Sequence, residues 1–547
     1  MFSKFKNLLS AKNSFAGATL ILILTLVCSN ILGLLRNRFL AQKITPYHLD
    51  TYLAAFRIPD LVFNLLLLGA VFAVFIPIFT EYISKKKYKT AWHIANSMVN
   101  LVVIGTIAIS IVLFFLMPVL IKWLVPGFDA FQQAQTIKLT RLLLLSPLFF
   151  GISYIFSGIL NSFRRFVVYS LAPLAYNIAI ILAVIFLSEN LGVWGVTLGV
   201  IFGAFLHMMI QLPIVIQLGY RWQPIVDLKH PEIKKMGKLM IPRSIGLAAA
   251  QVVLIIFTFL ASKWSGHVTY FNFANDIQTF FSVVFGSSFA VAVFPILSEN
   301  AAKNETRDFN SNLRVAFKQI LYFTLPFSIL IIMLRAEIVR LLLGTGFFGW
   351  EATVITADNL GAFAIGISAA SVIQLTARAY YAYKDMLTPT IMALISGAIS
   401  VVLGIILSQG IGSWRGLESV GLAIALSIGS IINFILLAIF QRDRALFWNR
   451  KLFLPILKYL VALIVLIVVA QICKVLTGNI VNMQTFLGVL IKTATTIILS
   501  FAVYIGLTYL WGCEEIGSFI KIFKQKVGFK IKKAEEVAIE ERGKTES

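Results

Sequence analysis

Few residues of this chain carry charge. Asp, Glu, Lys and Arg together make up 13% of the 547 residues, whereas hydrophobic residues make up 59%. Soluble domains contain about 25% charged residues, so the composition excludes a soluble protein of this size. The sequence predicts an all-α polytopic membrane protein.

Cysteine is scarce, and the motifs of soluble catalysis are missing. Cys28, Cys473 and Cys513 lie in or beside apolar segments without CxxC or metal-ligand spacing, so neither a disulfide framework nor a metal site is predicted. There is no Gly-rich phosphate loop after a strand, no HExxH, no GxSxG and no long extramembrane domain. We therefore expect a transporter rather than an enzyme, with no cofactor other than a coupling cation, Na⁺ or H⁺.

Acidic residues are half as frequent as basic ones, 24 against 47, which gives a formal net charge of +23. The Lys and Arg residues lie mostly in short connections between apolar runs, so they indicate membrane topology and contact with anionic lipids rather than nucleic-acid binding. Connections such as 85–89 and 442–451 are basic, whereas 128–135, 344–353 and 477–484 contain no Lys or Arg. This alternation predicts a multi-pass membrane protein with both termini in the cytoplasm.

Apolar runs predict fourteen membrane helices. They lie near 14–40, 51–81, 92–120, 136–161, 168–188, 192–218, 240–262, 267–298, 314–343, 354–383, 387–409, 416–441, 452–475 and 486–511.

An internal repeat organises these helices. Phe72 to Glu81 (FAVFIPIFTE) recurs as Phe289 to Glu299 (FAVAVFPILSE), so that Pro77 matches Pro295 at an offset of 218 residues. The repeat predicts two parallel six-helix units with a substrate cavity between them, followed by two further helices. The predicted divisions are a six-helix unit at 1–220, a cytoplasmic linker at 221–239, a second six-helix unit at 240–445, helices 13 and 14 at 446–512, and a charged cytoplasmic tail at 513–547.

The second apolar run, Asp50 to Glu81, does not look like a membrane anchor. It carries charged and polar residues toward one end and Pro and Gly residues along its length. Charged residues inside a span usually face a bundle interior or a watery cavity, and Pro and Gly permit bending. We expect hinge or gate positions at Pro59, Gly69, Pro77 and, in the second unit, Pro295.

Candidate cavity residues follow from the charges placed inside spans. Arg36 and Arg57 are expected to bind a phosphate-bearing substrate, because guanidinium groups pair with phosphate oxygens, or else to be snorkelling anchors at helix ends. Asp50 is expected to pair with one of these arginines or to cap the N-terminus of its own helix. Asp60 follows Arg57 by one turn, and the two are expected to form an ion pair. Asp276 is expected to bind a coupling cation or to form an interhelical hydrogen bond, and Asn64 completes the predicted cavity.

Several motifs resemble the MurJ/MviN family of bacterial lipid II flippases, within the MOP exporter superfamily. They are Ala54 to Asp60 (AAFRIPD), Gly69 to Tyr82 (GAVFAVFIPIFTEY), Val125 to Phe128 (VPGF) and Gly158 to Phe166 (GILNSFRRF). The resemblance covers essentially the whole chain and implies a flippase that moves undecaprenyl-diphosphate-linked peptidoglycan precursor by alternating access. It also implies membrane lipids and the cell-wall synthesis machinery as partners.

The chain departs from the family at cavity charges. The resembled family has an Arg where this chain has Asn30, an acidic residue at Asn37, and an Arg at Asp276. It also carries charge at positions occupied here by Phe63, Asn64 and Leu68. Two other functions stay open at this point: a flippase for another lipid-linked oligosaccharide, and a cation-coupled small-molecule antiporter of the related MATE type. A membrane scaffold that has lost transport also stays open.

Overall fold

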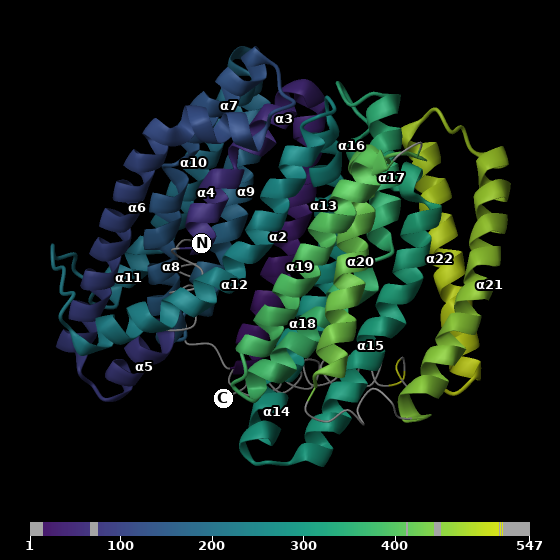
Figure 1. Cartoon of the computed structure of the whole chain (residues 1–547). Helices are drawn as coiled ribbons and strands as arrows, with labels where there is room; N and C mark the ends of the chain where they lie inside the picture. The colour runs from purple at the N-terminus through teal and green to yellow at the C-terminus, as the bar shows by residue number, and fades with distance from the viewer. Residues whose placement is uncertain are drawn as a thin grey trace, which may run out of the picture.

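The protein is helical throughout the part that the structure describes. The computed structural model describes residues 15–65, 75–411, 414–441, 450–513, 515 and 517 (Figure 1). Within these residues the only strands are β1 (Gly410–Ile411) and β2 (Trp414–Arg415), a short antiparallel pair between two long helices.

The helices fall into two halves and a C-terminal pair. The first half contains α2 (Phe15–Lys43), α3 (Pro46–Ala55), α4 (Arg57–Phe63), α5 (Ile76–Ser84), α6 (Tyr88–Leu124), α7 (Ala130–Leu143), α8 (Ser146–Ser162), α9 (Phe166–Leu191), α10 (Val193–Met209) and α11 (Leu212–Gln217). The second half contains α12 (Pro231–Ala261), α13 (His267–Ser282), the π-helix η3 (Val283–Ser287), α14 (Ser288–Ala302), α15 (Thr306–Met333), α16 (Arg335–Leu343), α17 (Trp350–Ala364), α18 (Ile367–Ala382), α19 (Leu387–Gln409) and α20 (Glu418–Ile439). The C-terminal pair is α21 (Arg450–Ile480) and α22 (Phe486–Leu510), which lies against the second half (Figure 1).

The all-α membrane architecture is confirmed. Each of the fourteen predicted apolar runs coincides with one or more helices wherever the structure describes it. Among the described residues, ten helices are long and apolar enough to cross a membrane, or eleven when the bent pair α17 and α18 counts as one span. The runs near 14–40, 51–81 and 240–262 are helical where the structure describes them, but each lies partly outside the residues to which that criterion applies, so the count of fourteen spans stays a prediction.

Proline accounts for the breaks within the second run. Pro59 lies in the first turn of α4, directly after the turn at Phe56 that ends α3. Pro has no N–H and its ring crowds the preceding turn, which favours an interruption of the helix there. Pro77 lies in the first turn of α5, and Pro295 lies inside α14, shortly after η3. Gly69 lies outside the described residues, and a hinge motion at these four positions stays a prediction.

The predicted linker at 221–239 is partly helical. α12 begins at Pro231 rather than near 240, because the His230 side chain accepts a hydrogen bond from the Glu232 amide and so caps the helix. The extended segment before it is held by α6, where Asn100 donates to the carbonyl oxygens of Gln223 and Ile225 at 2.7 and 2.8 Å. The segment between the two halves is therefore anchored on the first half.

Two glycines allow close backbone contact between the halves at the end of the molecule opposite α5 and α14 (Figure 1). A Cβ atom at Gly127, in the first half, would lie 2.3 Å from the carbonyl oxygen of Ser262 at the end of α12. A Cβ atom at Gly346, in the second half, would lie 2.0 Å from the carbonyl oxygen of Gln42 near the end of α2. Each half thus rests on the end of the other's first helix. This reciprocity supports the predicted two-unit division, which stays a prediction.

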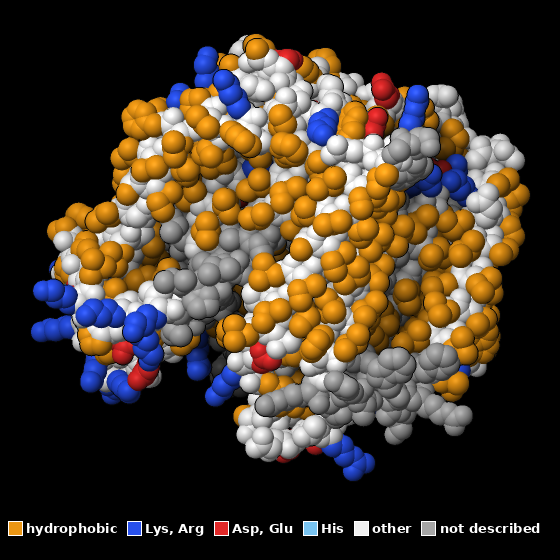
Figure 2. Space-filling model, in the orientation of Figure 1, with side chains coloured by type: hydrophobic (Ala, Val, Ile, Leu, Met, Phe, Trp, Pro, Cys, Tyr) orange, Lys and Arg blue, Asp and Glu red, His pale blue; other side chains and the backbone are white. Residues whose placement is uncertain are grey.

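The opposite end is open. Figure 2 shows the surface hollowed between the two halves on the side where α5 and α14 lie. This is also the side of the basic connection at 85–89, which the charge alternation places in the cytoplasm. In this conformation the halves are therefore joined on the predicted outer side, and a hollow lies between them on the predicted inner side, where α14 still contacts α2.

Candidate functional site

Polar residues from both halves meet in a cluster, which we call the cross-half cluster: Arg36 and Asn37 on α2, Asn177 on α9 and Asp276 on α13. Asn37 donates to Asp276 Oδ2 at 2.8 Å, and Arg36 Nη2 lies 3.8 Å from the same oxygen. Arg36 also donates to Asn177 Oδ1 at 3.4 Å and to Asn37 Oδ1 at 3.2 Å. The carboxylate of the second half thus faces an arginine of the first.

The cross-half cluster has one open side. The Asp276 side chain keeps 43% of its surface accessible and Arg36 keeps 23%, although both lie between helices of the bundle. Each therefore faces open space between the halves rather than a sealed core. The predictions for Arg36 and Asp276 agree with this placement. Asn37 was missed as a site residue, although a polar residue beside an arginine in an apolar helix is itself a signal.

Arg57 is buried between the halves, so the alternative of a snorkelling anchor is wrong. Its side chain is 6% exposed, and it donates from Nε to Thr258 Oγ1 at 2.7 Å and from Nη2 to Asn272 Oδ1 at 2.6 Å. The expected partner, Asp60, forms no ion pair with Arg57 and interacts with it only through the longer-range electrostatic field. Arg57 of the first half therefore binds α12 and α13 of the second.

Asp50 is a cap on another helix, which corrects both of its predicted roles. It is fully buried and accepts hydrogen bonds from the amides of Gly266 and Thr269, at 2.6 and 2.8 Å, and from the Thr269 hydroxyl at 2.7 Å. These amides belong to the N-terminus of α13, where unpaired N–H groups and the helix dipole favour a carboxylate. In this conformation Asp50 is closed to a ligand, so its assignment to a substrate cavity is not supported.

Arg38 and the predicted cavity residue Asn64 both contact backbone carbonyl groups. Arg38 donates to the carbonyl oxygens of Leu341 and Leu342 in the last turn of α16, and its guanidinium lies 5.4 Å from the ring centre of Phe486. Lys and Arg are favoured at helix C-termini because they pair with the orphan carbonyls. Asn64 donates to the Asp60 carbonyl within its own helix at 2.8 Å and so contacts no residue of the cross-half cluster.

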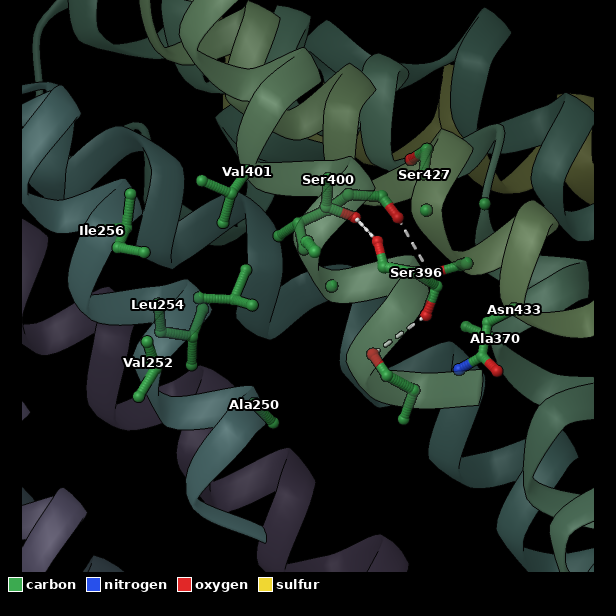
Figure 3. A pocket seen from close by; sticks show the side chains of 18 of the residues that line it. Ala250, Val252, Leu254, Ile256, Ala370, Ser396, Ser400, Val401, Ser427 and Asn433 are labelled. Atoms are coloured by element: carbon green, nitrogen blue, oxygen red, sulfur yellow. Dashed lines mark hydrogen bonds between the residues drawn. The ribbon is translucent and has the colours of Figure 1, made fainter. Parts of the chain in front are cut away.

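A cavity of about 970 Å³ lies beside the cross-half cluster in the second half (Figure 3). Its walls are mostly aliphatic, from α12 and α19, and Asn275 and Gln278 of α13 line it next to Asp276. Ser396, Ser400, Ser427, Ser430 and Asn433 add hydroxyl and amide groups. The Asn433 Oδ1 atom is buried without a partner in the described structure. Apolar walls with a few polar groups are typical of a small-molecule site.

The described residues contain no group of three or more His, Cys, Asp or Glu side chains that could hold a metal ion. The cavity residues named above supply hydroxyl and amide oxygens but no carboxylate. The coupling cation expected from the sequence thus stays a prediction.

Comparisons with solved structures agree with this architecture. "Lipid II flippase MurJ, inward closed conformation" matches with a TM-score of 0.74 at 24% identity, covering 91% of this chain and 100% of that one. A multidrug resistance MATE family transporter of the MOP superfamily, in an inward-facing conformation, matches with a TM-score of 0.64 at 15% identity, covering 77% of this chain and 96% of the other. At these identities the matches show a shared fold.

Sequence comparisons find relatives of nearly the same length. "Lipid II flippase MurJ" of Burkholderia cenocepacia is 23% identical over 456 residues, 81% of this chain and 85% of that protein. "Probable lipid II flippase MurJ" of Bdellovibrio bacteriovorus is 26% identical over 498 residues, 89% of this chain and 93% of that protein. The family described as "Lipid II flippase MurJ" matches residues 45–497. Since that match spans most of the chain, this protein belongs to the MurJ family.

Proposed function

We propose that this protein moves lipid II, the undecaprenyl-diphosphate-linked peptidoglycan precursor, across the bacterial cytoplasmic membrane by alternating access. Family membership supports the substrate. The observation that carries the proposal is the accessible Arg36–Asp276 pair, which lies between the two halves with a side open to the hollow. Guanidinium groups suit a diphosphate because they remain charged and can donate two parallel hydrogen bonds.

The geometry suggests how the headgroup is held. The long contact between Arg36 and Asp276, 3.8 Å, is weak enough for a phosphate oxygen to replace the carboxylate as the partner of Arg36. Asn37 then keeps Asp276 in place through its 2.8 Å hydrogen bond. The saccharide and peptide occupy the space between the halves, while the polyprenyl chain remains in lipid beside the broken helix α3 to α5.

Translocation requires the outer contacts to open. Three of them are polar: the Asp50 cap on α13, the Arg57 bridge to α12 and α13, and the Arg38 contact with α16. Polar contacts can exchange with water at little net cost when they separate. Opening must also expose part of the buried hydrophobic cluster that both halves share, which includes Leu49 of the first half and Val268 of the second. We propose that these contacts form the outer gate and that both termini lie in the cytoplasm with the open side.

Conditional rescue tests the proposal. The gene is expressed in a strain whose own lipid II flippase is depleted, with protein abundance in the membrane measured in parallel. Growth and normal cell shape are expected for the wild type and for Lys85→Gln, a change in an exposed pair with Glu81. Arg36→Gln at the same abundance is expected to abolish rescue. Failure of the wild type would overturn the assignment to lipid II.

A second candidate is a cation-coupled antiporter in which Asp276 binds the ion. It is favoured by the 43% accessibility of the Asp276 side chain and by the fold shared with MATE transporters. Drug efflux that requires Asp276, in cells that do not accumulate lipid II on depletion, would support this candidate. A flippase for another lipid-linked oligosaccharide would instead show rescue of a different glycan pathway by the wild type.

A further inference from the structure

A groove on the lipid-facing side of the first half has no role in the account above. It lies between α6, α7 and the start of α8, is closed at one end by Trp194 of α10, and has a volume of about 770 Å³. Its walls are almost entirely apolar, and Lys138 and Arg141 of α7 are the charged residues that line it.

Two prolines interrupt the helical hydrogen bonding beside the groove. Pro118 interrupts the hydrogen-bond ladder of α6, and Pro147, in the first turn of α8, separates α8 from α7. Each proline lacks the N–H that would bond the carbonyl four residues earlier. The carbonyl of Leu143 is instead bonded by the Ser146 hydroxyl at 2.8 Å.

Arg141 supplies the missing donor on α6. The carbonyl that Pro118 leaves without its helical partner is that of Phe114, and Arg141 Nε donates to it at 3.0 Å. The guanidinium carbon also lies 4.4 Å from the centre of the Phe114 ring. Phe114 lies within an uncharged run of α6 that ends at Ile121, seven residues and roughly 10 Å farther along the helix axis. Arg141 is thus a charge placed against the apolar part of α6, about two helical turns from the outer end of the uncharged run.

The two cations lack a counter-charge. Neither Arg141 nor Lys138 forms an ion pair with any acidic side chain of the described residues. Arg141 uses Nε for the Phe114 carbonyl and is half-buried, while Lys138, one turn nearer the outer end of α7, is exposed. An unpaired charge in this position is costly, so an anion from outside the chain would stabilise the arrangement.

We propose that the groove binds an anionic phospholipid of the predicted outer leaflet, with its phosphate at Lys138 and Arg141 and one acyl chain between α6 and α8. The ligand chemistry follows from the lining: a monoanionic headgroup suits two adjacent donors, and an acyl chain suits aliphatic walls such as Ile107 and Ile111. The site is separate from the cross-half cluster, and the inference does not depend on the transported substrate.

Photo-crosslinking from inside the groove tests this site. Phe115, which lines the groove and is 74% exposed, is replaced by benzoylphenylalanine in the full chain. Trp123, on the same helix and 76% exposed but outside the groove lining, is replaced in the matched control. Both proteins are placed in nanodiscs of equimolar phosphatidylglycerol and phosphatidylcholine with identical chains, irradiated, and their lipid adducts are compared by mass spectrometry.

Phosphatidylglycerol adducts are expected to exceed phosphatidylcholine adducts at least threefold at position 115 and to equal them at position 123. Lys138→Gln combined with Arg141→Gln is expected to reduce the ratio at 115 to that at 123. Lys138→Gln alone, a change at an exposed residue that does not threaten folding, is expected to reduce it in part. Equal ratios at the two positions, or a ratio at 115 that neither variant lowers, would overturn the proposal. The crosslinking is also repeated in buffers that contain inorganic phosphate or chloride at equal ionic strength. Loss of the phosphatidylglycerol preference in the phosphate buffer would also overturn the proposal, because the site would then bind phosphate without lipid.

Discussion

The carboxylate of Asp50 accepts hydrogen bonds from both the amide and the hydroxyl of Thr269, at 2.8 and 2.7 Å, across a sequence separation of 219 residues. Asp50 belongs to α3 in the first half, whereas Thr269 belongs to the first turn of α13 in the second. A helix terminus of one half is therefore capped by the other. When the halves are closed, Asp50 accepts hydrogen bonds from the N-terminal N–H groups of α13. When the halves separate, those N–H groups must bond to water instead.

Removal of this cap is expected to weaken closure on the predicted outer side. Asp50→Ala leaves two amides unpaired, each at a cost of about 1–3 kcal/mol if it stays buried. Closure is measured by disulfide formation between Gln42→Cys and Phe347→Cys, where the Phe347 amide lies 3.4 Å from the Gln42 carbonyl oxygen. The three native cysteines are replaced by serine. Asp50→Ala is expected to slow the cross-link several-fold.

The control for this experiment is Asp358→Ala, which removes an exposed carboxylate paired with Arg335 inside the second half. It is expected to leave the cross-linking rate unchanged, because an exposed pair contributes little. Equal rates for the two alanine variants would show that the Asp50 cap does not hold the halves together.

Lysine is not expected to replace Arg57. The guanidinium bridges Thr258 on α12 and Asn272 on α13 with separate nitrogens, and a single ammonium lacks the rigid planar fork that spans both acceptors. Arg57→Lys and Arg57→Gln are both expected to lose rescue of the flippase-depleted strain at normal abundance. Full rescue by Arg57→Lys would show that only the positive charge of Arg57 is required, and not its two separate hydrogen bonds.

Substitutions of Arg36 and of Asp276 are expected to differ in their effect on rescue of the flippase-depleted strain. Arg36 is proposed to bind the diphosphate, and Asp276 to pair with Arg36 only when no substrate is bound. In that case the Asp276→Asn variant is expected to rescue growth, whereas the Arg36→Gln variant is not. If Asp276 is an ion site, Asp276→Asn is the more damaging change. Growth rate at matched membrane abundance separates the two results. Loss of rescue with Asp276→Asn alone would favour the antiporter-like coupling role.

The C-terminal pair depends on a buried ionic contact. Glu337 of α16 is 8% exposed, and its Oε1 lies 3.0 Å from Lys492 Nζ on α22 and 3.5 Å from Lys474 Nζ on α21. Glu337→Gln leaves the buried Lys492 without its counter-charge, and the expected loss of stability is about 3–5 kcal/mol. Thermal unfolding in detergent measures the loss.

Adding Lys492→Met to Glu337→Gln should restore most of that stability, because no uncompensated buried charge then remains at Lys492. An unfolding temperature of the double variant no higher than that of Glu337→Gln would show that the contact is not the cause. The exposed Lys303–Glu299 pair provides the comparison, since Glu299→Gln is expected to change the unfolding temperature little.

The sequence was sufficient to locate the helices. Long uncharged runs must form helices in a bilayer, since no other structure satisfies an isolated span's backbone groups. The break near Pro59 was also predictable, because proline disrupts the helix locally. The start of α12 could not be located from the apolar run near 240–262, because the helix extends beyond that run and His230 is a less common cap than the serine, threonine, asparagine and aspartate residues that mark most helix starts.

The partners of the site residues were not predictable. Aspartate near the start of an apolar run is typical of a cap on its own helix. Only the tertiary structure shows that Asp50 caps a helix more than 200 residues away in the sequence. Arg57 and Asp60 satisfy the spacing of an ion pair, yet Arg57 turns toward Thr258 and Asn272. Spacing along one helix describes neighbours on that helix and carries no information about the side chains that another half brings close.

The most direct test of the account is translocation of lipid II by the purified protein in liposomes, with and without an imposed proton or sodium gradient. The wild type is expected to expose lipid II to an external probe faster than protein-free liposomes. Arg36→Gln, reconstituted at equal density, is expected to reduce the protein-dependent rate at least tenfold. No acceleration by the wild type under any gradient, or an equal rate with Arg36→Gln, would contradict the account.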